Sequence, residues 1–169
     1  MPDQEPLILG VDPGTAITGY GLVSSVRYSH QVKPVAYGCI TTDKNVPLEK
    51  RLYIIYQSID SLLNQYHPTE IAVEELFFNK NSKTAISVGE ARGVVMLCAA
   101  MHSLPIYEYT PLEVKKSVVG YGRASKEQVI YMVQQILSIS EKLKPDDVAD
   151  ALAVALCRAF RVSIPAAYV

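Results

Sequence analysis

Hydrophobic residues in the first quarter of the chain form three short runs separated by polar turns. The runs occupy residues 7–11, 19–23 and 35–40 and are rich in residues that favour β-structure. Because only turn-sized gaps separate them, the pattern predicts three consecutive strands arranged as an antiparallel meander.

The hydrophobic period becomes helical after Pro47. Leucine and isoleucine then recur at the spacing of an amphipathic helix over 48–66. Beyond it the sequence predicts a strand at 71–73, a helix over 82–101 and a strand at 106–109. Because a helix lies between successive strands here, we expect parallel pairing through right-handed crossovers.

The last third of the chain is predicted to be helical. Helices are expected over 112–119, 125–139 and 145–161, with Ser125 as N-cap of the second and Pro145 in the first turn of the third. The whole pattern predicts an α/β fold with a five-stranded mixed sheet, three antiparallel strands followed by parallel ones, flanked by helices. This arrangement resembles the ribonuclease H plan.

Length and composition limit the class of protein. A chain of 169 residues that is 49% hydrophobic can form one well-packed domain, expected over 1–169, and the segment after about residue 162 is a candidate for a flexible tail. There is no signal-like N-terminal segment and no apolar run long enough for a bilayer, so we expect a cytoplasmic protein without membrane contact. The three cysteines lack paired spacing and are interpreted as buried free thiols.

The net charge of −1 hides an uneven distribution of charge. Residues 79–126 contain seven basic and three acidic side chains. This local excess favours a positive face that could bind phosphates. An ordinary solvated surface would give the same pattern, so charge alone does not decide the function.

Four acidic residues stand at expected element ends or on a buried helix. Asp12 follows the first strand, Glu74 closes the fourth, and Asp147 and Asp150 share one face of the apolar last helix. A turn explains Asp12 alone, and the helix dipole explains Asp147, but neither explains Asp150. Since the first and fourth strands should be neighbours, we expect all four carboxylates to converge.

A site built only from Asp and Glu suits hard divalent cations. Magnesium, with manganese as a substitute, is the expected ion, and up to two ions per subunit are predicted. Two such ions can activate a water and stabilise the leaving oxygen of a phosphodiester. Hydrolysis of nucleic acid is therefore the favoured reaction.

Two consecutive rings, Phe77 and Phe78, stand in a polar and basic segment after the fourth strand. A core position is the usual fate of a phenylalanine. Two adjacent rings on a loop-like segment cannot easily both point inward, so one is a candidate for stacking on a base.

Several segments together closely resemble the RuvC family of Holliday-junction resolvases. They are residues 8–15, 18–21, 73–81, 89–93, 114–120 and 147–153. The resemblance implies that the four acids named above bind metal. The family spacing favours Glu74 over Glu75 and Asp147 over Asp146.

The same resemblance implies a mode of DNA binding. Phe77 would act near the branch point, and Lys115 and Lys126 would hold DNA near the scissile phosphate. Further basic residues that could extend this track are Lys80, Lys83, Arg92, Lys116 and Arg123.

The resemblance also implies the substrate and the partners. These are four-way junction DNA, a second copy of the chain paired through helix 82–101, and the branch-migration proteins RuvA and RuvB. Symmetric paired nicks in recombination and repair, leaving 5′-phosphate and 3′-hydroxyl ends, would be the reaction.

Two alternatives belong to other functional classes. A junction-binding scaffold without catalysis would not need all four acids. An ATP-dependent phosphotransferase of the actin and sugar-kinase type also carries Asp-x-Gly-Thr after its first strand, but needs a second lobe that a chain of this length cannot supply.

Overall fold

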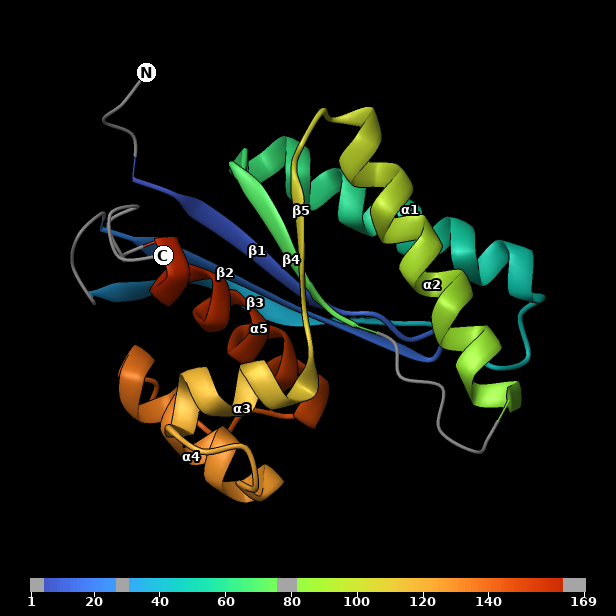
Figure 1. Ribbon diagram of the computed structural model, residues 1–169. Helices are drawn as coiled ribbons and strands as arrows, with labels where there is room; N and C mark the ends of the chain where they lie inside the picture. Colours follow the sequence, from blue (N-terminus) through green and yellow to red (C-terminus); the bar gives the residue numbers. More distant parts are fainter. Residues whose placement is uncertain (1–4, 27–30, 76–81, 163–169) are drawn as a thin grey trace.

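The computed structural model describes residues 5–26, 31–75 and 82–162, which form one sheet with helices on both faces (Figure 1). The strands are β1 (Leu7–Asp12), β2 (Ile17–Ser25), β3 (Val32–Thr41), β4 (Glu70–Glu74) and β5 (Ile106–Tyr109). The helices are α1 (Leu48–Tyr66), α2 (Ser82–Met101), α3 (Pro111–Val119), α4 (Lys126–Leu137) and α5 (Asp146–Val162). The predicted tail from residue 163 lies outside the described residues.

The sheet has the order β3-β2-β1-β4-β5. Its first three strands in the sequence pair antiparallel, whereas β1 with β4 and β4 with β5 pair parallel. The predicted mixed sheet is confirmed. β2 and β3 are longer than predicted because their antiparallel pairing continues past the hydrophobic runs, from Ile17 opposite Thr41 to Ser25 opposite Val32.

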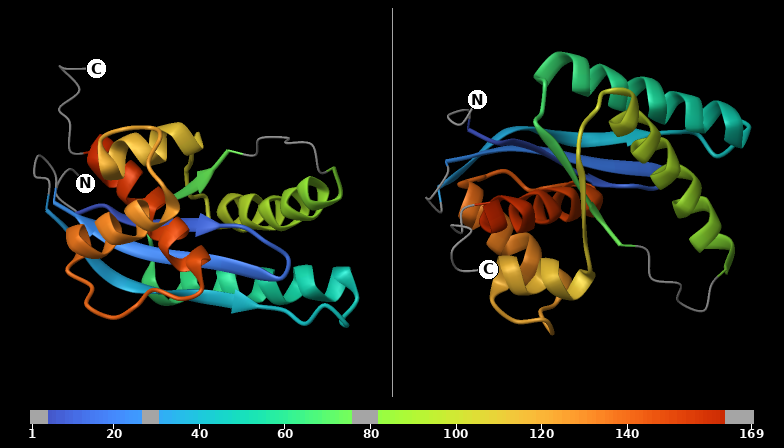
Figure 2. Two further views of the ribbon diagram at one scale, coloured as in Figure 1. Left: turned by 90° about the horizontal axis from the view of Figure 1, so that it is seen from below. Right: turned by 45° about the horizontal axis from the view of Figure 1, so that its top comes forward.

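The two faces of the sheet support separate hydrophobic cores. Along β1, Ile8 belongs to the core under α5, and Leu9 belongs to the core under α1 and α2. The views in Figure 2 place α1 and α5 on opposite sides of the sheet. The strand alternation therefore decides which side chains face α5.

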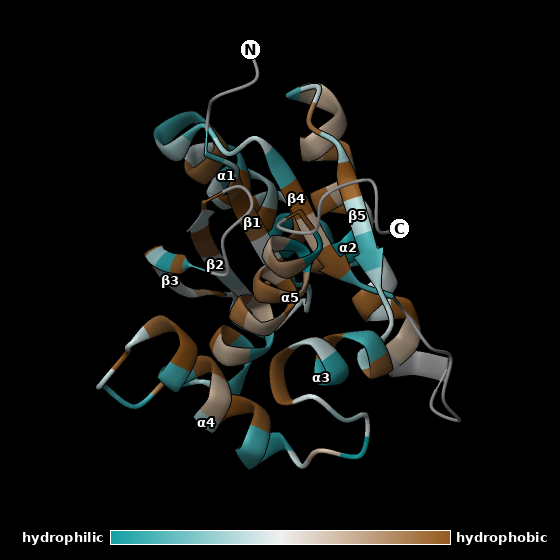
Figure 3. Cartoon of the chain, turned by 60° about the vertical axis from the view of Figure 1, so that its left-hand side comes forward, coloured by the Kyte–Doolittle hydropathy of each residue, from teal (hydrophilic) through white to brown (hydrophobic). Residues whose placement is uncertain are grey.

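Helix α5 is the central helix of its layer. Between Val148 and Cys157 every residue except Asp150 is buried, as the apolar pattern predicted. Helices α3 and α4 pack on α5 from outside, and Figure 3 shows the apolar character of most of α5. Because its neighbours on α5 are buried, the presence of a carboxylate at Asp150 needs an explanation.

Two strand glycines allow α5 to lie directly on the sheet. A Cβ at Gly19 would be 2.0 Å from the Asp147 carbonyl oxygen, and one at Gly10 would be 2.1 Å from the Ala151 carbonyl oxygen. Any larger side chain would push the helix away, so these glycines fix the height of α5 above β1 and β2.

The start of α5 differs from the prediction. The helix begins at Asp146, and Pro145 precedes it instead of occupying its first turn. The Pro145 carbonyl accepts a hydrogen bond from the Val148 amide at 3.1 Å, so the proline supplies an acceptor at the helix entrance.

Two further sequence expectations have outcomes. Cys98 and Cys157 are buried as predicted, whereas Cys39 on the edge strand β3 is partly exposed. No helix within the described residues combines the length and the apolar character needed to cross a membrane.

Candidate functional site

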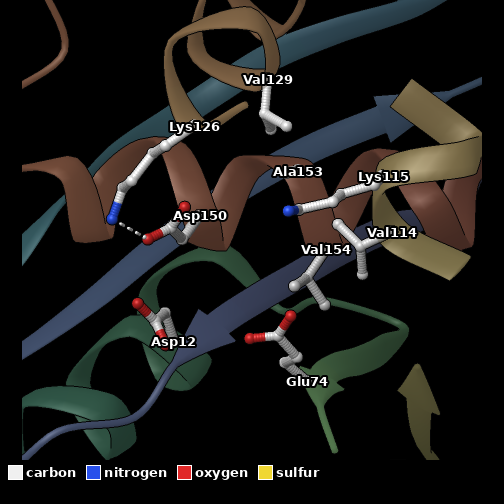
Figure 4. A pocket seen from close by; sticks show the side chains of 9 residues that line it. All are labelled: Asp12, Glu74, Val114, Lys115, Lys126, Val129, Asp150, Ala153 and Val154. Carbon is white, nitrogen blue, oxygen red and sulfur yellow. Dashed lines mark hydrogen bonds and ion pairs between the residues drawn. The ribbon is translucent and has the colours of Figure 1, made fainter. Parts of the chain in front are cut away.

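A cavity opens where the ends of β1 and β4 meet the first half of α5. Asp12, Glu74 and Asp150 line it, and Lys115 from α3 and Lys126 from α4 reach it from the opposite side (Figure 4). Its apolar walls are formed by Val114, Val129, Ala153 and Val154. Three of the four predicted acids therefore share one cavity.

Strand register explains why two of these acids meet. Val11 of β1 pairs with Val73 of β4, so Asp12 and Glu74 follow on adjacent parallel strands. Two residues earlier on these strands, Ala72 packs in the core under α5, and a Cβ on Gly10 would point at α5. The alternation of the strands therefore directs both carboxylates to this face. Glu74 lines the cavity, while the neighbouring Glu75 donates its amide to the Tyr109 carbonyl.

The turn after Asp12 is held by hydroxyl groups. Thr18 donates its hydroxyl to the Gly14 carbonyl at 2.7 Å, which closes the turn. The hydroxyl of Thr15 lies 2.5 Å from that of Ser87 on α2. These bonds fix the backbone that carries Asp12 to both β2 and α2.

Burial makes the cavity acids hard to ionise. Burial raises the pKa of Asp12 to about 7, and repulsion from Asp150, Asp147 and Glu74 adds to the shift. Burial, followed by repulsion from Asp150, raises the pKa of Glu74. When these carboxylates are ionised, the surrounding groups therefore do not fully compensate their negative charge.

The fourth acid, Asp147, stands one helical turn before Asp150. It does not line the cavity itself, yet its charge raises the pKa values of both Asp12 and Asp150. The contending residue Asp146 is more exposed, with its carboxylate 3.7 Å from the Lys126 ammonium.

One lysine forms a direct ion pair with a cavity acid. The Nζ atom of Lys126 donates to Oδ2 of Asp150 at 2.9 Å. Burial raises the pKa of Asp150 even though this lysine lowers it, so one ammonium does not fully compensate the carboxylate. Lys115 points into the cavity, forms no ion pair with the described residues, and lowers the pKa of Glu74 by its charge.

Comparison with known proteins decides the family. A model of the family described as crossover junction endodeoxyribonuclease RuvC matches residues 8–158. The chain belongs to the RuvC family. This confirms the predicted resemblance and the predicted class of enzyme, an endodeoxyribonuclease, and it favours neither the scaffold nor the phosphotransferase alternative.

Individual RuvC proteins are similar over most of the chain. The crossover junction endodeoxyribonuclease RuvC of Moorella thermoacetica is 58% identical over 90% of this chain and 90% of its own. That of Desulforamulus reducens is 52% identical over 90% and 93%. T. thermophilus RuvC in complex with a Holliday junction substrate has a TM-score of 0.88 and 34% identity, covering 94% of this chain and 95% of its own. The predicted ribonuclease H-like fold is confirmed.

The acids of the cavity fit a divalent cation whose ligand shell is completed by the substrate. Within the described part of the chain, no three His, Cys, Asp or Glu side chains are close enough together to enclose an ion. Magnesium uses only a few carboxylates and completes its shell with water and phosphate. The under-compensated oxygens of Asp12, Glu74 and Asp150 match such an open site.

The other predicted DNA contacts of this RuvC chain have different outcomes. Lys116 and Arg123 are exposed and do not line the cavity, although each stands within three residues of a lysine that does. Lys83 lies in the first turn of α2, and nothing is described of its side chain. Phe77 and Lys80 lie outside the described residues.

Arg92, another residue of the predicted DNA track, forms an ion pair within the chain. Its guanidinium pairs with the carboxylate of Glu108 on β5 at 2.5 Å, and only 16% of the arginine side chain is exposed. The positive charge of Arg92 therefore links α2 to β5. Counting basic residues along the sequence could not reveal this partner.

The sequence also missed two parts of the site. The apolar wall made by Val114 and Val129 carries only a helical-period signal, which any core residue would share. The contact between Thr15 and Ser87 joins segments far apart in the chain and leaves no local pattern.

Proposed function

We propose that this chain is a divalent-cation-dependent endonuclease that resolves four-way DNA junctions. It makes two symmetric nicks and leaves 5′-phosphate and 3′-hydroxyl ends, in homologous recombination and DNA repair. The observation that carries this proposal is the meeting of Asp12, Glu74 and Asp150 in one cavity with two lysines, in a chain of the RuvC family.

The proposed ions are magnesium or manganese, up to two per subunit. Asp12, Glu74, Asp147 and Asp150 would hold them. When bound, such ions activate the attacking water and stabilise the leaving oxygen of a phosphodiester. The apolar walls of the cavity lower the polarity next to these carboxylates, which strengthens the charge interactions on that side.

The basic residues then have separate roles around the scissile phosphate. Lys115 and Lys126 reach the cavity and would steady the phosphate directly. The exposed Lys116 and Arg123 would contact the backbone on either side, without reading sequence. Further contacts from Phe77, Lys80 and Lys83 are proposed from the resemblance.

We further propose that two copies pair through α2. Large apolar side chains are exposed on this helix, including Ile86 at 62%, Leu97 at 57% and Met101 at 61%. A second copy would remove this surface from water, and its two-fold axis would present two equivalent sites to two strands. Cooperation with RuvA and RuvB and a cytoplasmic location are proposed from the resemblance.

The experiment uses a labelled mobile four-way junction with magnesium. The natural chain should give paired nicks that can be ligated, whereas Asp12→Asn should bind the junction with similar affinity and cut at least about 100-fold more slowly, because it lacks one carboxylate of the set. Asp43→Asn, which changes an exposed acid away from the cavity, is the matched control and should cut normally.

Three other outcomes would contradict the proposal. Unchanged cutting by Asp12→Asn would remove the cavity from the reaction. Tight binding without any cutting by the natural chain would favour the scaffold, and ATP turnover in a parallel assay would favour the phosphotransferase.

A further inference from the structure

Lys126 forms a contact that the proposed reaction does not require. Its Nζ atom lies 2.9 Å from Oδ2 of Asp150 and 3.7 Å from Oδ2 of Asp146. Both acids belong to the first turn and a half of α5, whereas Lys126 begins α4. Figure 4 shows the ammonium beside the Asp150 carboxylate, with Asp12 in the same cavity.

The backbone of Lys126 is held in place while its side chain remains mobile enough to change partner. Ser125 caps α4 and accepts a hydrogen bond from the Gln128 amide, and the Gln128 side chain accepts one from the Ser125 amide. The lysine side chain itself is 49% exposed and has a flexible four-carbon stem. A fixed base and a free ammonium suit a group that must move over a short distance.

This contact is specific among the basic groups near the cavity. In residues 5–26, 31–75 and 82–162, Lys126 is the basic side chain that forms an ion pair with an acid lining the cavity. Lys115 also reaches the cavity, and its charge acts on Glu74 without an ion pair. The oxygen held by Lys126 belongs to a carboxylate proposed above as a cation ligand.

We propose that Lys126 is a built-in counter-ion that holds Asp150 when no divalent cation is bound and releases it when the cation binds. The released ammonium is then available to the scissile phosphate. This inference rests on the proposed function and adds a regulatory step to it. Lys126 is thus a positioning residue for Asp150 before the substrate arrives.

The proposal predicts the direction in which removing the ammonium changes the affinity for a divalent cation. An ammonium and a divalent cation that compete for one carboxylate oppose each other's binding, and the opposition is reciprocal. Removing the ammonium must therefore tighten cation binding. A lysine that acted only on DNA would leave cation binding without DNA unchanged.

The first test is thermal unfolding of the full chain without DNA, in EDTA and over a titration with magnesium chloride. Lys126→Met keeps the length of the side chain and removes its charge. We expect a lower Tm in EDTA, a larger rise with magnesium, and a half-saturating magnesium concentration lowered by about fivefold or more. Lys142→Met removes an exposed charge outside the cavity and should show the same magnesium titration as the natural chain. Equal magnesium midpoints for the natural chain and Lys126→Met would overturn the inference.

A second test needs no substitution. Acetylation of lysines in the natural chain, followed by mass spectrometry, should show Lys126 becoming more reactive when magnesium is added, while the exposed Lys142 stays constant. Unchanged reactivity of Lys126 at magnesium concentrations that raise the Tm would contradict the release step.

Asp12→Asn separates failure of this inference from failure of the proposed site. If magnesium raises the Tm of the natural chain but not of Asp12→Asn, the cation site stands, and an unaltered Lys126→Met titration refutes the counter-ion alone. If magnesium has no effect on the natural chain, the proposed cation site and the counter-ion fail together.

Discussion

The carbonyl oxygen of Asp147 lies 2.0 Å from the position that a Cβ atom on Gly19 would occupy. Gly19→Ala must therefore lift the start of α5, and we expect the free energy of unfolding to fall by about 2 kcal/mol or more. Because Asp147 and Asp150 move with this helix, junction cutting should fall as well. Urea denaturation and the junction assay measure the two effects.

Gly38→Ala is the matched control for this substitution. Gly38 lies in the same sheet, but the atom nearest to its added Cβ would be the Tyr20 hydroxyl at 2.8 Å, at the far end of a side chain. We expect a smaller loss of stability and normal cutting. Equal losses for the two alanines would mean that the height of α5 is not set by Gly19.

The raised pKa of Asp12 predicts how stability depends on pH in the absence of divalent cations. The pKa is 3.8 as the ordinary value and about 7 in the folded chain, so the folded state binds the extra proton between these values and stability falls as the pH rises through this window. Asp12→Asn removes the cost. In EDTA it should raise the free energy of unfolding by up to about 4 kcal/mol at pH 8 and by much less at pH 4.

Denaturation of the natural chain and Asp12→Asn at several pH values checks this. The exposed Asp43→Asn should change stability little at any pH. If the two chains differed in free energy of unfolding by the same amount at pH 4 and pH 8, ionisation of Asp12 would not be the cause of the difference.

A buried ion pair anchors the other end of α5. Arg158 donates to both carboxylate oxygens of Glu70 at 3.0 and 2.8 Å, and its guanidinium lies 3.4 Å from the centre of the Tyr107 ring. Arg158→Met would leave the Glu70 charge buried without a partner, so we expect a loss of about 3 kcal/mol in chemical denaturation.

Arg161→Met provides the comparison on the same helix. Its partner is Glu113, and both side chains are more exposed, at 47% and 37%. Solvent weakens such a pair, so the loss should be about 1 kcal/mol or less. The reverse order of the two losses would contradict the assignment of Arg158 as the main anchor.

The salt dependence of junction binding distinguishes contacts to the DNA backbone from contacts inside the cavity. Lys116→Met and Arg123→Met should each weaken junction binding and reduce the slope of log Kd against log salt by about 1, because each removes one phosphate contact. Neither should change the magnesium-induced rise in Tm. A similar substitution of the exposed Lys142, on the segment before α5, should leave the slope unchanged.

The sequence alone predicted those elements in which the hydrophobic residues keep one helical or strand spacing. The bounds of α1, α2 and β5 match the predictions. In α1 and β5 a hydrophobic or aromatic residue stands at each end. Pro145 was assigned to the first turn of α5 from its usual preference, but the helix begins one residue later. Local preference identified the helix and did not fix its first residue.

Contacts between distant segments set the limit for the site. Asp12 and Glu74 were predicted as neighbours because strand order follows from topology. The partners of Lys126 and Arg92 depend on how helices cross other elements, which no spacing in the sequence encodes. Hence the acids were predictable as a group, and the pairing of individual charges was not.

The acids of the cavity come from β1, β4 and α5, the last helix that the structure describes. During translation, a nascent chain that has left the ribosome only as far as α4 carries Asp12 and Glu74 but has no Asp150 to complete the set. Under the proposed function, cutting therefore cannot begin before α5 has been synthesised and has packed on the sheet.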